Sequence, residues 1–167
     1  MTAQAWDSVS PVNVNQRFER AEDAPPAGAG APPFRMAALT FPADKDYLAL
    51  ARTSAMHVAG LLDLPIGRVT DLRIAVDEAC AVFLTPQPAV PSTFELCFER
   101  YAGYLSVTVR GPAPAKWPPA DDELGWRMLQ ALVGEVRAET KDGIGTLTLI
   151  EPLQGRQHHG RRDTDSD

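Results

Sequence analysis

The sequence predicts one α+β domain, a two-layer sandwich with about three helices on one face of a mixed or antiparallel β-sheet. Apolar residues recur at helical spacing in some segments and alternate with polar residues in others. The predicted order is strand, helix, helix, strand, strand, helix, strand, strand, and consecutive strand pairs beside helices are typical of this class. A length of 167 residues suits one domain with tails.

The first half of the domain is predicted to contain one strand and two helices. Residues 35–41 predict the strand, and Asp44 is placed to cap the helix that follows Pro42. The apolar face of this helix consists of Leu48, Ala51, Ala55, Val58 and Leu62. A second helix is expected from about Arg68 to a point before Pro86. Its apolar stripe consists of Val69, Leu72, Val76, Ala79, Cys80 and Phe83.

The second half is predicted to contain two hairpins and one helix. Alternation of apolar and polar side chains predicts the strands, and short glycine-containing turns join the strands of each pair. The strands are expected at residues 94–98, 105–109, 136–140 and 145–151, and the helix at about 122–135.

Two terminal segments lack the apolar residues that a core needs. Residues 1–33 include a run of Pro, Ala and Gly, which predicts a disordered arm. Residues 154–167 are polar and without periodicity, which predicts an equally mobile tail. The folded domain is therefore expected at residues 34–153.

The charge and hydropathy of the chain argue against several classes of partner. A net charge of -6 disfavours a nucleic-acid backbone or an anionic membrane. No apolar run approaches the roughly 18 to 20 residues of a membrane span, and the first ten residues do not resemble a signal peptide. We expect a cytoplasmic protein that binds neither nucleic acid nor membranes.

The cysteines and histidines do not form a metal-binding pattern. Cys80 and Cys97 are not in a CxxC pair, and His57, His158 and His159 have no companion cluster of ligands. We expect two buried thiols and no metal. We also expect no disulfide, because Cys97 is on the strand face opposite its apolar neighbours. A redox switch between the two thiols is the alternative.

Residues 71–82, Asp-Leu-Arg-Ile-Ala-Val-Asp-Glu-Ala-Cys-Ala-Val, carry the most specific motif of the chain. They resemble the N-box helix of the GHKL ATP-binding superfamily (Bergerat fold), in particular of the small anti-sigma factors with a serine-protein-kinase fold. Three further segments are similar to parts of the same family, one before this motif and two after it, and they stand in the family's order. The resemblance is closest to a degenerate actinobacterial branch. These segments are residues 42–52, similar to the first helix with its arginine, residues 124–136, similar to the helix that opens with the glycine pair, and residues 143–149, similar to the closing Gly-Thr strand.

The resemblance implies an anti-sigma factor that sequesters an alternative, stress- or development-type RNA polymerase sigma factor. An anti-anti-sigma partner of the STAS type would release it, and a homodimer is compatible with this role. The family uses its helix-one arginine against both partners, so Arg52 is assigned to the interface, although an ordinary exposed side chain is the simpler interpretation. The alternatives are an ATP-dependent serine kinase that phosphorylates the anti-anti-sigma factor, and an α+β domain of unrelated function.

The resemblance also implies where a nucleotide would bind. In nucleotide-binding members the N-box glutamate orients water or the substrate hydroxyl, and an asparagine one helical turn later binds magnesium. Glu78 matches the glutamate, but Val82 stands at the asparagine position and cannot ligate a metal. Gly125, Gly145 and Thr146 would complete an ATP site. Glu78 is otherwise one of several acids on a solvated helix face.

The loop that should hold the nucleotide departs from the family pattern. Arg110 stands at the expected place of the adenine-binding aspartate and has only donors. Trp126 would crowd the helix N-terminus, and Trp117 and Trp126 are either ordinary core and loop aromatics or plugs of a defunct pocket. Four prolines remove N–H groups that a phosphate cradle needs, namely Pro112, Pro114, Pro118 and Pro119. We expect no cofactor, and Glu78 as a vestige of lost kinase activity.

Overall fold

The computed structural model describes residues 32–84, 92–120 and 123–153. Residues 1–31 of the predicted arm, the predicted tail with His158 and His159, the prolines after the second predicted helix and Asp122 lie outside these residues. Along the chain the elements are β1 (Phe34–Pro42), a short 3-10 helix η1 (Lys45–Tyr47), α2 (Leu48–Leu61), α3 (Ile66–Ala81), β2 (Thr93–Tyr101), β3 (Tyr104–Pro112), α4 (Leu124–Leu132), β4 (Glu135–Lys141) and β5 (Ile144–Pro152).

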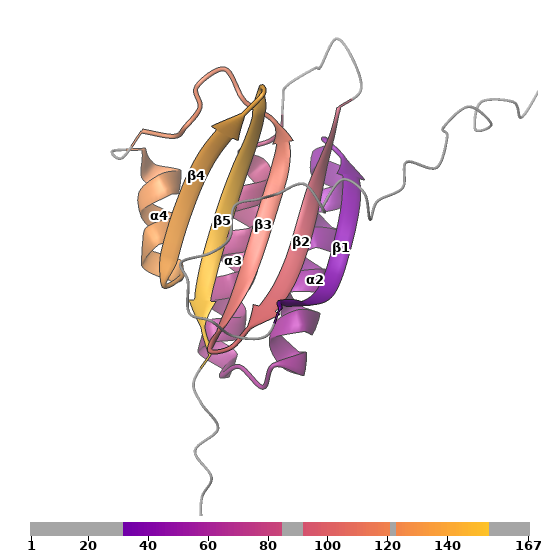
Figure 1. Ribbon diagram of the computed structural model, residues 1–167, viewed down its shortest axis with the longest axis vertical. Helices are drawn as coiled ribbons and strands as arrows, with labels where there is room; N and C mark the ends of the chain where they lie inside the picture. The colour runs from indigo at the N-terminus through magenta and orange to yellow at the C-terminus, as the bar shows by residue number, and fades with distance from the viewer. Residues whose placement is uncertain (1–31, 85–91, 121–122, 154–167) are drawn as a thin grey trace, which may run out of the picture. The chain divides into compact units, whose positions relative to one another are not determined.

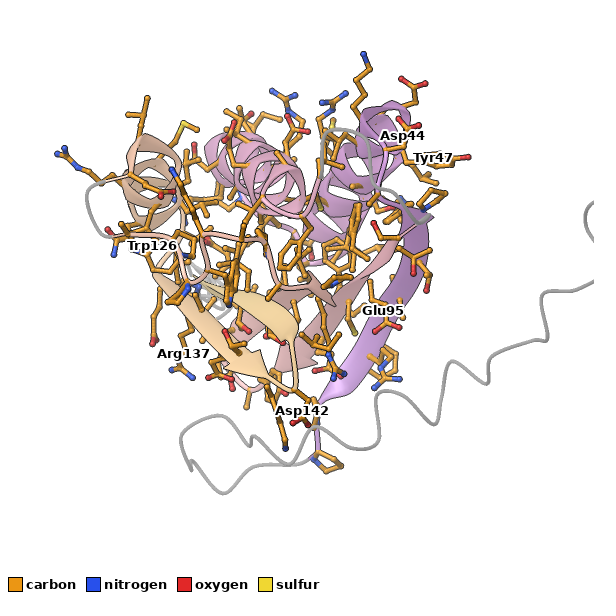
Figure 2. The ribbon with its side chains drawn as sticks, turned by 90° about the horizontal axis from the view of Figure 1, so that it is seen from above. Asp44, Tyr47, Glu95, Trp126, Arg137 and Asp142 are labelled. Carbon is orange, nitrogen blue, oxygen red and sulfur yellow. The ribbon has the colours of Figure 1, made fainter. Side chains whose placement is uncertain are left out.

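The strands form one five-stranded sheet in the order β1-β2-β3-β5-β4, and every neighbouring pair is antiparallel. Helices α2, α3 and α4 lie on one face of this sheet, as the views from the side and from above show (Figures 1 and 2). The predicted α+β sandwich is confirmed, and of the two sheet types left open the antiparallel one is present. No helix among the described residues is long and apolar enough to cross a membrane.

The core lies between the sheet and the helices. Phe94, Leu96 and Phe98 of β2 point into it, as their alternation predicts, together with apolar side chains of β3 and β5. Helices α2 and α3 contribute the two predicted stripes, whose central members are at most 3% exposed. The fold thus depends on two periodicities in one sequence, two for the strands and 3.6 for the helices.

The beginnings of the first two helices follow from local backbone chemistry. Asp44 accepts a hydrogen bond from the backbone N–H of Asp46 at 2.9 Å, so it caps η1, from which α2 continues. Helix α3 begins at Ile66, two residues earlier than expected, and its first turn closes when Val69 N–H donates to the carbonyl of Pro65 at 3.0 Å. Proline is tolerated there because the first N–H groups of a helix have no partner inside it.

Helix α4 ends at Leu132, three residues before the expected end. Val133 is already extended, with φ of -127° and ψ of 169°, and its side chain is 6% exposed. The burial of this β-branched side chain therefore outweighs the continuation of the helix, and β4 begins two residues later.

Two tight turns connect the hairpins. Gly103 has a φ of +93° in the turn between β2 and β3. Between β4 and β5, Asp142 and Gly143 both have positive φ, 52° and 76°, which is the conformation of a type I′ turn. Lys141 belongs to β4 and Ile144 to β5, so the turn is shorter than the gap between the expected strands at residues 136–140 and 145–151.

An ion pair connects the first turn of α3 to the end of β5. Glu151 lies on the helix-facing side of β5 and is 2% exposed. Arg68 donates through Nε to Oε1 of Glu151 at 2.7 Å and through Nη2 to its other oxygen, while Nη1 lies 3.0 Å from Asp71. The hydrogen bonding to Glu151 raises the pKa of Arg68. No helical or strand periodicity in the sequence predicts this pair.

Candidate functional site

The expected nucleotide site lies at the end of the sheet where β3 finishes and β5 begins (Figure 1). Helix α3 ends on this side of the molecule and α4 begins there. Glu78 of α3, Gly125 of α4 and the glycine pair Gly111–Gly145 of β3 and β5 therefore come from separate parts of the sequence to one region.

Glu78 lies on the side of α3 that faces α4. One of its carboxylate oxygens is 4.0 Å from the position that a Cβ atom would take on Gly125. Within the described residues Glu78 has no hydrogen-bond or ion-pair partner. The carboxylate is half-buried beside the first turn of α4, where the partial positive charge of the helix favours an anion.

The position one turn after Glu78 offers no metal ligand. Val82 is half-buried and packs against the hydrophobic core. Over residues 32–84, 92–120 and 123–153, no group of three or more His, Cys, Asp or Glu side chains is arranged to hold a metal ion.

Two aromatic rings fill the space over the glycine pair. Gly111 and Gly145 are cross-strand partners. A Cβ atom on Gly145 would lie 3.0 Å from Cε2 of Trp117, and one on Gly111 would lie 3.1 Å from Cδ1 of Phe83. The ring centroids of Phe83 and Trp117 are 5.3 Å apart, with the planes inclined at 46°. The glycines thus make room for protein side chains.

Arg110 and Thr146 do not join this region. They pair across β3 and β5, next to Val109 and Gly145, which face the helices. Since successive side chains of a strand point to opposite faces, Arg110 and Thr146 lie on the face without helices. Arg110, which the resemblance placed at the adenine position, therefore does not face the helices, and the helix-facing position at the end of β3 is Gly111.

Trp126 is a core residue of α4. It is 9% exposed and lies between α4 and β4 (Figure 2). Its indole N–H is buried without an acceptor in the part of the chain that the structure describes. Trp117 behaves differently, because its indole N–H donates to the carbonyl of Glu139 at 2.9 Å. Of these two tryptophans, Trp117 is the one over the expected site, because its ring packs on Gly145.

The residues at this end of the sheet do not fit a bound ATP and magnesium. Val82 has no ligand atom for the metal, and Gly111 has no side chain that could accept from an adenine amino group. The rings of Phe83 and Trp117 occupy the surface that the glycine pair leaves open. Glu78 is the one expected catalytic group that keeps a suitable place.

Arg52 lies on the side of α2 that faces α3. Its Nη1 is 2.8 Å from Oδ1 of Asp77, and the two side chains are 35% and 30% exposed. Arg52 therefore belongs to a half-exposed ion pair between two helices, and part of its guanidinium can still reach a partner.

The two cysteines are free and buried, on opposite faces of the sheet. Cys80 belongs to the core between sheet and helices, and Cys97 is on the other side of β2 from Leu96 and Phe98. Burial raises the pKa of Cys80 to about 12 and that of Cys97 to about 11. The predicted face assignment is confirmed.

Comparisons of sequence and of structure give different results. No family model and no curated protein matches this sequence. The fold matches the crystal structure of the RsbU and RsbW domains of Rv1364c from Mycobacterium tuberculosis, with a TM-score of 0.55 and 20% sequence identity. The match covers 75% of this chain and 33% of that chain, so the present chain spans about a third of its structural neighbour. At this identity the likeness establishes a shared α+β fold and nothing more.

Proposed function

We propose that this protein is a regulator of the anti-sigma class. It would sequester an alternative RNA polymerase sigma factor, be released by an anti-anti-sigma partner of the STAS type, and work in the cytoplasm. Four family-like segments, in the family's order, fold as that family's sandwich would require. The fold shared with about a third of the RsbU and RsbW structure supports the same class, at the level of architecture alone.

The observation that carries the proposal is the packing of Trp117 on Gly145 at the expected nucleotide site. The chain keeps the helix that resembles the N-box, but a phosphoryl transfer site also needs a metal ligand and room for the nucleotide. Val82 and the two aromatic rings take both away. Sequestration needs only a complementary surface, so this function survives the changes that remove catalysis.

The kinase alternative is favoured by one observation, the half-buried Glu78 carboxylate beside Gly125. It is tested by incubating the protein with Mg-ATP and a candidate STAS partner. Phosphorylation of a serine in the partner, absent in a Glu78→Gln variant, would establish the kinase and overturn the proposal. We expect no transfer by either protein.

The proposal is tested by purifying the full chain from its native host and identifying what binds to it by mass spectrometry. A sigma factor should be recovered, and adding purified protein should inhibit transcription by RNA polymerase that carries this sigma factor. Transcription that continues unchanged at a saturating excess of the protein would contradict the proposal.

A further inference from the structure

The loop between β3 and α4 is fastened to the β4–β5 hairpin at two points. Near its start, the backbone N–H of Ala113 donates to the carbonyl of Gly143 at 2.9 Å. Further along, the Trp117 indole N–H donates to the carbonyl of Glu139 at 2.9 Å. Residues 113–117 of the loop are therefore held against the end of the sheet, and Trp117 is the large side chain that they insert.

The place that Trp117 enters is formed by missing side chains. Phe94 of β2, Gly111 of β3 and Gly145 of β5 lie side by side across three neighbouring strands, on the face toward the helices. The last two have no side chain. The indole is in direct contact with the bare backbone of β5, and Phe83 closes the gap from the end of α3. A flat aromatic group is the shape that this place accepts.

We infer that Trp117, backed by Phe83, replaces a bound nucleotide as the filling of this end of the sandwich, so that partner binding is uncoupled from ATP and ADP. The claim that partner binding is uncoupled from nucleotides rests on the proposed function. The claim that Trp117 occupies the site rests on the contacts of Trp117 alone. In this chain Trp117 would stay over the glycine pair whether or not a nucleotide is present.

The first experiment tests the filling without any partner. Trp117→Ala should lower the melting temperature by about 5 °C or more, because the site cannot collapse onto bare glycine backbone. Free indole should then raise the melting temperature of the variant and leave that of the wild type unchanged, because only the variant leaves the half-buried place over Gly145 open for a ring. Phe34→Ala is the matched control, because Phe34 is 68% exposed and leaves no cavity.

A second variant keeps the inference testable if Trp117→Ala does not fold. Gly145→Ala introduces a Cβ 3.0 Å from Trp117, so it should destabilise the wild type. Gly145→Ala alone decides if Trp117→Ala does not fold, because a Gly145→Ala variant as stable as the wild type would contradict the contact. Where Trp117→Ala does fold, the same substitution should cost less in that background, because the contact is absent, and the double-mutant cycle measures this coupling. If the two substitutions changed stability additively, or if Trp117→Ala melted at the wild-type temperature, the inference that Trp117 fills this place would be contradicted.

The third experiment concerns nucleotides. Calorimetry should detect no binding of Mg-ATP to the wild type, and the dissociation constant of the sigma-factor complex should be the same with ATP, with ADP and without either. A tenfold change in that constant would overturn the uncoupling. Failure to find a sigma-factor partner would instead contradict the proposed function and leave the melting experiments to decide on the filling.

Discussion

Arg68 at the start of α3 holds the buried carboxylate of Glu151 at the end of β5 with two hydrogen bonds. Glu151 follows Leu147 and Leu149 on the helix-facing side of its strand, so it takes a place where an apolar residue would be expected. A charge in such a place is costly unless it is paired. The guanidinium fork supplies the pair and fixes how α3 meets the sheet.

Replacing Arg68 with alanine should reduce the free energy of unfolding by about 3 kcal/mol, because Glu151 would be left buried without a cation. Urea unfolding measures the effect. Arg137→Ala is the matched control, since its partner Glu135 is 51% exposed and such pairs contribute about 1 kcal/mol or less. Equal losses in the two variants would show that the burial of Glu151 has no energetic consequence. The double variant Arg68→Met/Glu151→Leu should be close to the wild type.

If Arg52 is an interface residue, Arg52→Ala should weaken sigma-factor binding by about 2 kcal/mol, the scale of an interface hot spot. Stability should fall by about 1 kcal/mol or less, since the ion pair with Asp77 is half-exposed. Asp77→Asn is the control, because it breaks the same ion pair and keeps the guanidinium. Equal losses of binding in the two variants would mean that the pair acts by holding α2 against α3, and an unchanged affinity for Arg52→Ala would move the interface elsewhere.

The buried thiols should make the protein less stable in alkali. The pKa values of Cys80 and Cys97 rise from 9.0 to about 12 and about 11, chiefly through burial, so the native state keeps protons that the unfolded state releases. The free energy of unfolding should therefore fall as pH rises above about 9, by up to about 1.4 kcal/mol per pH unit for each thiol. Urea unfolding over that pH range should show a smaller slope for Cys97→Ser.

The same burial should keep both thiols unreactive in the native protein. We expect no labelling by a thiol reagent at about pH 8 and labelling of both after denaturation. A Cys80–Cys97 disulfide formed in good yield after mild oxidation, with the fold retained, would contradict the placement of the thiols on opposite faces of the sheet.

A shortened chain of residues 34–153 should fold by itself. It contains every helix and strand from β1 to β5, and its last residue, Leu153, donates its N–H to the carbonyl of Gly103 at 2.8 Å. Thermal unfolding should be cooperative and close in temperature to that of the full chain. A large loss of stability would assign a structural role to residues 1–33 or 154–167.

The sequence is sufficient to predict the order and type of the elements, because its two periodicities agree with the final packing. It is insufficient where a contact depends on residues distant in the chain. The end of α4 depends on the burial of Val133, and the face of Arg110 depends on the register between β3 and β5. The sequence contains one indication of the Arg68–Glu151 pair. Glu151 continues the apolar alternation of β5, and a carboxylate in such a position requires a cation nearby.

The candidate site was predictable in its residues and less so in its geometry. The resemblance pointed to Glu78 and Gly125, which lie close together, and to Gly145, which packs on Trp117 and Phe83. It also included Thr146, which lies on the other face of the sheet. The contact of Trp117 with Gly145 is between a loop and a strand. It cannot be predicted from helical or strand periodicity, because a loop has neither. Glycine in the middle of a strand was the available signal, since it often marks a close approach.

The strand order also constrains the path by which this chain folds. The β2–β3 and β4–β5 hairpins close through tight turns and need only local contacts. The pairing of β1 with β2 must wait until the whole α2–α3 segment has been looped out, which costs chain entropy before any contact is gained. We therefore expect the edge strand to join last, so that substitutions in β1 accelerate unfolding and hardly alter the rate of refolding.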